Sequence, residues 1–206
     1  MEKQKVVHNN LENVEKVYYA DFDVKIDGNL SEWKNIPSIH IGTEDWLLGG
    51  VSAEIYLAWD EGNIYLAAAV SDKGHFNTCE GDAIWNGDSL QFAFDAPETS
   101  PFSLGVALAS NKVQSFQWRG PDTKLFEKSE YTVVRDEKNN KTFYEIRIPF
   151  ECLKMKAEKG MVFGFNAVVF EDPDGTGEKY WVEITSGIAG GWNPDMFKRF
   201  VLWNDK

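Results

Sequence analysis

Residues 53–70, AEIYLAWDEGNIYLAAAV, contain the clearest local pattern in the chain. On both sides of the polar sequence Asp60-Glu61-Gly62-Asn63, apolar residues recur at every second position, which is the period of a half-buried β-strand. A short polar segment with a glycine between two such runs indicates a turn. The segment therefore predicts an antiparallel hairpin, and the buried face of its first strand carries Ala53, Ile55, Leu57 and Trp59.

The same period of two recurs along most of the remaining chain. It predicts strands at 89–95, 143–149, 161–170, 179–184 and 199–203, and weaker ones at 17–25, 103–110, 113–119 and 130–136. Only residues 150–154 are typical of a helical turn. Many short strands separated by turn residues are characteristic of an antiparallel β-sandwich. We therefore expect an all-β fold, an antiparallel sandwich of immunoglobulin or jelly-roll type with very little helix.

The length of 206 residues, without a composition break or an internal repeat, favours one domain. The first sixteen residues are polar and have no clear period, so we predict a tail or linker at 1–16 and a single domain at 17–206. The N-terminal sequence lacks the apolar region of a signal peptide. No run approaches the 18 apolar residues typical of a membrane span.

Charge and cysteine content exclude several partner classes. The chain has 33 acidic and 21 basic residues, a formal net charge of −12. Such a surface repels a phosphate backbone and an anionic membrane, so we expect neither nucleic acid nor membrane as a partner. Cys79 and Cys152 are too few for a disulfide scaffold or a cysteine-rich zinc site. One bridge between them stays open as an alternative to two thiols.

Sequence signatures of common enzymes are absent. The three histidines have no metal-ligand spacing, and there is no HExxH, G-x-S-x-G, phosphate-binding loop or dinucleotide fingerprint. Asp88, Asp95 and Glu183 lie on or beside strands and could form a carboxylate pair as in glycosidases. A hydrogen-bonded surface role is commoner for such residues. A sandwich that binds haem through Met or His is a third alternative.

Aromatic residues make up 14% of the chain, and two of its eight tryptophans lie in turn-forming sequence. Trp85 lies in DAIWNGD (82–88), and Trp192 lies in GGWNP (190–194). An exposed indole is a flat apolar platform for the apolar face of a pyranose ring. Each could equally cap an end of the core, because tryptophan is usually mostly buried. Trp33 and Trp59 are expected to be structural, and Trp46 fits either role.

Five segments in order resemble the family-nine carbohydrate-binding modules. They are KIDGNLSEW (25–33), YLAWDEGNIY (56–65), WNGDSLQF (85–92), GFN (164–166) and GWNPDMF (191–197). The resemblance covers about residues 17–204. It implies a β-sandwich appended to secreted polysaccharide-degrading enzymes, two tryptophans that clamp a terminal sugar, and bound calcium that supports the loops. Trp85 and Trp192 match the positions of those two tryptophans.

We therefore expect a non-catalytic module that binds a saccharide or the end of a polysaccharide chain. The resemblance implies a secreted or cell-surface location, and we expect a monomer or one part of a multidomain glycoside hydrolase. The candidate sugar-binding residues are Trp85, Trp192, Gln91, Asp88, Asn193 and Arg119. The alternatives are a glycan-active enzyme domain that uses strand carboxylates, and a sandwich that has lost sugar binding.

The chain departs from the family pattern at the expected binding face. Gln91 replaces an acidic residue, and Gly105 and Ala107 replace an arginine and an asparagine that face the ligand in sugar-binding members. Hydroxyl recognition supplies specificity, so a clamp without these polar groups would bind the same sugar weakly. Either the ligand differs or binding is lost.

A calcium site is the one metal site that the sequence suggests. The acidic segment DPDGTGE (172–178) does not match an EF-hand and first of all predicts a hairpin turn. Asp72 falls near a calcium position of the family. Carboxylate and carbonyl oxygens suit calcium rather than zinc. The candidate calcium ligands are Asp72, Asp172 and Asp174.

Overall fold

The computed structural model describes residues 14–42, 50–97, 99–120, 125–177 and 179–205, and strands dominate them. The strands are β1 (Glu15–Tyr19), β2 (Ser38–Gly42), β3 (Ser52–Trp59), β4 (Asn63–Ser71), β5 (Ser89–Asp95), β6 (Phe102–Ala109), β7 (Lys112–Arg119), β8 (Glu130–Asp136), β9 (Lys141–Pro149), β10 (Val162–Glu171), β11 (Tyr180–Glu183) and β12 (Lys198–Trp203). Two short α-helices, α1 (Leu125–Lys128) and α2 (Phe150–Leu153), and three 3₁₀ helices, η2 (Leu30–Asn35), η4 (Gly81–Asn86) and η5 (Pro194–Met196), lie between them. Within these ranges, no helix has the length and apolar character needed to cross a membrane.

The strands form one sheet of mixed direction. Ten of them pair in the order β7-β6-β5-β10-β12-β1-β3-β4-β9-β8, and β11 and β2 pair with β10 and β3. β1 is parallel to both β12 and β3, so the prediction of a purely antiparallel sheet is wrong in this respect. The residue period is the same for both directions, and long stretches of chain separate β1 from both partners, which parallel pairing requires.

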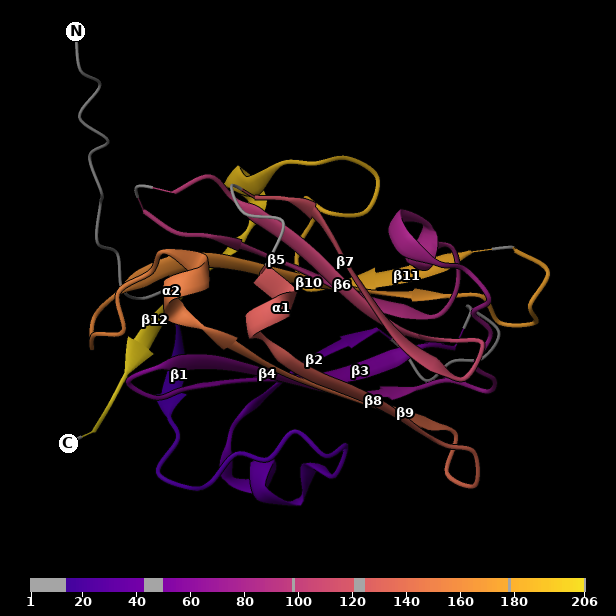
Figure 1. Ribbon diagram of the computed structural model, residues 1–206, viewed down its shortest axis with the longest axis horizontal. Helices are drawn as coiled ribbons and strands as arrows, with labels where there is room; N and C mark the ends of the chain where they lie inside the picture. Colours follow the sequence, from indigo (N-terminus) through magenta and orange to yellow (C-terminus); the bar gives the residue numbers. More distant parts are fainter. Residues whose placement is uncertain (1–13, 43–49, 98, 121–124, 178, 206) are drawn as a thin grey trace, which may run out of the picture.

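The sheet is folded into two layers with the main core between them. Figure 1 shows β5, β6, β7 and β10 in one layer and β3, β4, β8 and β9 in the other. Phenylalanines from three strands pack together in this core, for example Phe94 with Phe163 and Phe165 at centroid distances of 6.0 and 5.1 Å. Each fully buried phenylalanine contributes about 1.5–3 kcal/mol to the free energy of unfolding.

The predicted hairpin is confirmed as β3 and β4, in which Trp59 pairs with Ile64. The predicted inward face of β3 lies in the main core. Its outer face is covered by the N-terminal segment that contains Trp33, which is fully buried and donates from Nε1 to Glu145 Oε1 at 2.9 Å. Trp33 and Trp59 are therefore structural, as predicted.

Several local predictions need correction. β1 begins at Glu15, before the expected domain boundary, and residues 20–25 are not a strand. β2 and α1 were not expected, whereas α2 confirms the helical turn. Tyr180 is exposed, although alternation over 179–184 predicts that it faces inward with Val182 and Ile184. Cys79 and Cys152 are both free thiols.

Candidate functional site

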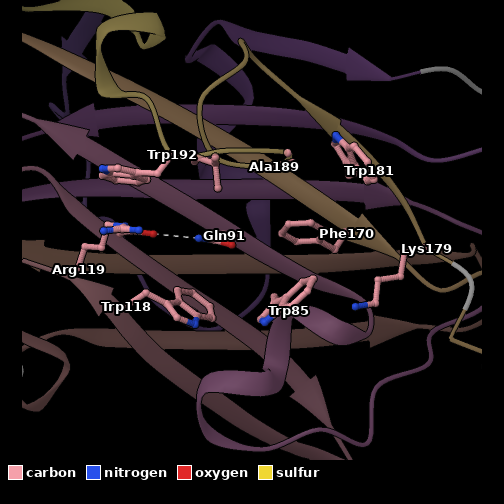
Figure 2. A pocket seen from close by; sticks show the side chains of 12 residues that line it. Trp85, Gln91, Trp118, Arg119, Phe170, Lys179, Trp181, Ala189 and Trp192 are labelled. Atoms are coloured by element: carbon pink, nitrogen blue, oxygen red, sulfur yellow. Dashed lines mark hydrogen bonds between the residues drawn. The ribbon is translucent and has the colours of Figure 1, made fainter.

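A pocket of about 380 Å³ opens on the outer face of the β5–β6–β7–β10 layer. Its volume lies in the range of small-molecule sites, about 300–1,000 Å³. Tryptophans from four different segments surround it (Figure 2). The full lining is Trp85, Gln91, Ser103, Trp118, Arg119, Phe170, Lys179, Trp181, Ile188, Ala189, Gly190 and Trp192.

The alternation of β5 gives the pocket its polar floor. Leu90 and Phe92 point into the core, so Gln91 between them points outward. On β6, Ser103 reaches the same face, and its hydroxyl accepts a hydrogen bond from Gln91 Nε2 at 2.9 Å. These two short side chains are neutral. They can exchange hydrogen bonds with a ligand but cannot form an ion pair with one.

A β-bulge between β6 and β7 brings two consecutive side chains to the pocket. Arg119 pairs with Ser103 and Gln117 pairs with Leu104, which leaves Trp118 as the extra residue. A bulge of this kind redirects side chains, so that Trp118 and Arg119 both line the pocket. Regular alternation would have placed them on opposite faces of the sheet.

The indole of Trp118 packs against Gly105, in the space that a side chain at position 105 would take. A Cβ at Gly105 would lie 2.7 Å from two ring carbons of Trp118, so only glycine allows this packing. The indole is held further by its Nε1, which donates to the carbonyl of Asp82 at 3.0 Å. At Gly105, where the family pattern has a ligand-facing side chain, the ring of Trp118 therefore covers the backbone. Ala107, the second replaced position, is fully buried.

Trp85 lies in η4 and is 39% exposed. Its ring contacts Phe170 in a T-shaped geometry at 5.9 Å between centroids. The ammonium of Lys179 lies 3.8 Å from the centroid of Trp85 and donates to the side-chain oxygen of Asn86. These contacts hold the indole at the edge of the pocket with part of its surface open to solvent.

Trp192 comes from the loop between β11 and β12. Its ring packs at 84° against Phe197, with 5.5 Å between centroids, and the guanidinium of Arg119 lies 4.8 Å from its centroid. Gly190 and Gly191 have φ values of 72° and 153°, which favour glycine and let the loop turn just before the indole. Two loops more than a hundred residues apart in sequence therefore contribute to one pocket.

Four of the six candidate sugar-binding residues line the pocket, namely Trp85, Trp192, Gln91 and Arg119. Asp88 does not, because it is buried and its carboxylate accepts hydrogen bonds from the backbone of Phe76 and Asp172. Asn193 does not either, since its side chain caps η5 by accepting from the backbone of Asp195. Trp46 lies outside the described residues.

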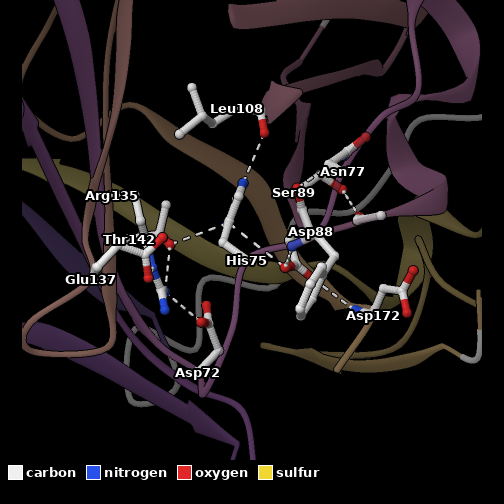
Figure 3. Close-up of polar contacts among 12 residues, drawn as sticks. Asp72, His75, Asn77, Asp88, Ser89, Leu108, Arg135, Glu137, Thr142 and Asp172 are labelled. Carbon is white, nitrogen blue, oxygen red and sulfur yellow. Dashed lines mark hydrogen bonds and ion pairs between the residues drawn. The ribbon is translucent and has the colours of Figure 1, made fainter. Parts of the chain in front are cut away.

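Asp88 belongs instead to a buried polar cluster (Figure 3), in which its carboxylate lies 3.7 Å from Nδ1 of His75. Asp72 forms an ion pair with Arg135, and His75 Nε2 donates to the carbonyl of Leu108 at 2.8 Å. Burial raises the pKa of Asp88 to about 7. Burial and the neighbouring charges of Asp88 and Asp72 raise the pKa of Glu171 to about 9. Glu171 therefore favours the protonated form at neutral pH, and Asp88 is close to half protonated there.

The three predicted calcium ligands have different hydrogen-bond and ion-pair partners. Asp72 is paired with Arg135, which already supplies a positive charge. Asp172 accepts from the backbone of Gly177, and Asp174 is exposed and accepts from Thr176. In the part of the chain that the structure describes, no three His, Cys, Asp or Glu side chains are grouped as metal ligands. Calcium binding at these residues stays a prediction.

Phe170, Lys179 and Trp181 line the pocket but were not among the candidate residues from the sequence. Phe170 and Trp181 are paired neighbours on β10 and β11 and form an aromatic wall, in which Trp181 is 49% exposed. Lys179 precedes β11 and reaches across to Trp85. The pairing of β10 with β11 was predicted, and the outward position of Trp181 follows from alternation with Val182. That signal could have identified Trp181.

Comparison with known proteins leads to the same family that the sequence resembles. The family model described as "Carbohydrate family 9 binding domain-like" matches residues 26–204. Two structures of a family 9 carbohydrate-binding module from Caldicellulosiruptor kristjanssonii, in complex with cellotriose and with glucose, each align with a TM-score of 0.70 and 18% identity. They cover 93% of this chain and 95% and 97% of their own. At this identity the structural likeness shows the fold. No curated protein matches.

Proposed function

The chain belongs to the carbohydrate family 9 binding domain-like family of non-catalytic modules, and from this premise we propose that it binds a saccharide in the pocket between Trp85 and Trp192. The observation that carries the proposal is the gathering of four half-buried or exposed indoles around a polar floor. Aromatic rings bind the apolar faces of sugars, and the few polar groups fix the orientation of the ring. The two neighbouring structures hold cellotriose and glucose, which are ligands of this class.

We propose further that Trp85 and Trp192 hold one sugar ring between them. Both indoles line the same pocket, and Trp181 extends the aromatic wall beside Trp85. One face of each clamp indole is in contact with a cation, Lys179 or Arg119. A bound ring therefore stacks on the uncovered face, or takes the place of the cation. Gln91 and Ser103 are the proposed hydroxyl partners on the floor.

The biological setting that we propose follows from the family resemblance. The module would direct a larger secreted or cell-surface polysaccharide-degrading enzyme to its substrate, as a monomer or as one part of that enzyme. Its task is then to raise the local concentration of the enzyme at the saccharide, because the second binding event becomes intramolecular. Pull-down of insoluble polysaccharides by a fusion to a reporter protein tests this role.

The sugar-binding proposal is tested by calorimetric titration against a panel of mono- and disaccharides. Stacking on an aromatic ring contributes about 0.5–1.5 kcal/mol beyond area burial. Trp85→Ala and Trp192→Ala should each weaken the best ligand several-fold, and the double variant should abolish measurable binding. Trp203→Ala is the matched control, because Trp203 lies on β12 outside the pocket and also carries a lysine, Lys16, at 3.9 Å from its ring.

The opposing interpretation is that the two tryptophans only cap the core. In that case each alanine variant would lose roughly 3–5 kcal/mol of unfolding free energy, as for large buried aromatic residues. Affinity of the folded fraction would stay unchanged. Melting temperature and affinity measured on the same samples separate the two interpretations, and a panel without any binding saccharide would refute the proposed function.

A further inference from the structure

The charged residues of the pocket are all positive. Among the described residues that line it, Arg119 and Lys179 are charged and no Asp or Glu is present. The chain as a whole has 33 acidic and 21 basic residues. A pocket with two cations and no carboxylate thus differs in sign from the net charge of the chain. A local field of this kind attracts an anionic group.

Both cations are positioned at the proposed stacking platforms. Lys179 Nζ lies 3.8 Å from the ring centroid of Trp85, and the Arg119 guanidinium lies 4.8 Å from that of Trp192. Figure 2 shows both side chains at the rim of the aromatic pocket. Neither forms an ion pair with a carboxylate from the described ranges within 4 Å. Their charges are therefore available to a ligand that stacks beside them.

Lys179 is also partly desolvated. Burial lowers its pKa, although the charge of Asp172 acts in the opposite direction. Its one hydrogen-bond acceptor among the described side chains is the neutral amide of Asn86. An ammonium group that has lost water without gaining a carboxylate partner is stabilised by an incoming anion.

The hydrogen-bonding groups of the pocket also favour an anionic ligand, because most of them are donors. Arg119 offers five N–H donors and Lys179 offers three, whereas the lining side-chain acceptors are the neutral oxygens of Gln91 and Ser103. Neutral sugars present hydroxyls, which bind well to carboxylate acceptors. A donor-rich pocket instead suits a group that only accepts, such as a carboxylate or a sulfate.

We propose that the preferred ligand is an anionic saccharide, whose carboxylate or sulfate is held by Arg119 and Lys179 while its ring contacts an adjacent indole. The inference rests on the proposed function, since it assigns the substrate class of the same pocket. It also accounts for one departure from the family pattern, the loss of the acidic residue at position 91. Gln91 replaces an acid that would repel such a ligand, and Gly105 makes room for the ring of Trp118, which lines the pocket together with Arg119.

The test compares anionic sugars with their neutral parents on the wild-type chain. Glucuronate is titrated against glucose, galacturonate against galactose, and glucose 6-sulfate against both acids. We expect at least one anionic sugar to bind about tenfold more tightly than its parent, which corresponds to about 1.4 kcal/mol. The preference should shrink at high salt, because ions screen partly exposed charges. The acid and the sulfate arms distinguish the two sources of negative charge.

Variants then assign the preference to the two cations. Arg119→Gln and Lys179→Gln should each reduce it, and the double variant should remove it. Lys112→Gln is the matched control, because Lys112 begins the same strand that Arg119 ends, is exposed, and does not line the pocket. The control should leave the preference unchanged.

Each outcome decides one question. Neutral sugars that bind as well as the anionic ones overturn this inference and leave the proposed function standing. A preference for anionic sugars that survives in the double variant overturns the assignment to Arg119 and Lys179. Absence of binding by every neutral and anionic sugar overturns the proposed function itself, together with the inference.

Discussion

Gly105→Ala is the substitution that most directly tests the packing of the pocket floor. The new methyl group would lie 2.7 Å from two ring carbons of Trp118 and 3.3 Å from the carbonyl oxygen of Leu90. Ordinary carbon contacts are about 3.5–4.0 Å, so the indole has to move by roughly 1 Å. Overpacking of this kind costs about 1–3 kcal/mol. Gly105 is not in the left-handed region, so loss of glycine flexibility in the unfolded chain returns about 0.4–1 kcal/mol.

The net expectation is a loss of about 1 kcal/mol of unfolding free energy, or a melting temperature lower by about 2–4 °C. Saccharide affinity should fall several-fold, because the displaced indole moves into the pocket. A double-mutant cycle with Trp118→Ala identifies the cause. Without the indole, Gly105→Ala should be neutral or slightly stabilising. Thermal unfolding and calorimetric titration of the four chains provide both measurements.

Gly62→Ala is the control for a glycine replaced without a clash. Its added methyl group would meet only Asp60 Oδ1, at 3.6 Å, which is an ordinary contact. The reasoning would be refuted if Gly105→Ala destabilised the chain equally with and without Trp118. It would also be refuted if Gly105→Ala left both melting temperature and affinity unchanged.

Three further predictions concern stability. Burial raises the pKa values of Asp88 and Glu171 to about 7 and about 9, so the folded chain retains protons that the unfolded chain has released. The melting temperature in EDTA should therefore fall from pH 5 to pH 9, and Glu171→Gln should flatten that slope; a rising curve contradicts this. Calcium, expected from the family resemblance, should raise stability by about 2.7 kcal/mol at a hundred times its dissociation constant, and equal melting temperatures in EDTA and millimolar calcium would exclude it. Glu145→Ala leaves buried Trp33 Nε1 and the Gly28 amide without their acceptor, so urea unfolding should show a loss of roughly 2–4 kcal/mol, and a loss below 1 would show that water replaces the carboxylate.

The sequence predicted those parts of the fold that depend on neighbouring residues. The hairpin of β3 and β4 and the inward faces of β5 and β10 follow from local alternation, and all are present. The parallel pairing of β1 with β12 depends on residues far apart in the chain, and a period of two contains no information about strand direction. Prediction of a purely antiparallel sheet failed for that reason.

The site was predicted to a similar extent. Trp85 and Trp192 were identified because turn-forming residues flank them, and both line the pocket. Asp88 was assigned to the ligand face from its place beside a strand, but backbone amides from Phe76 and Asp172 hold its carboxylate inside. The presence of both Trp118 and Arg119 in the pocket depends on a bulge, which has no signature in the alternation of β7.

The position of β1 between β12 and β3 has a consequence for biosynthesis. Glu15, near the start of the described chain, pairs with Phe200, near its end, and β12 is also the neighbour of β10. During synthesis on the ribosome, the two layers therefore stay unjoined along this seam until β12 has emerged. Closure of so long a loop costs entropy before the pairing repays it, and such topologies fold slowly. The nascent domain thus completes its sheet only after nearly all of its sequence has been translated.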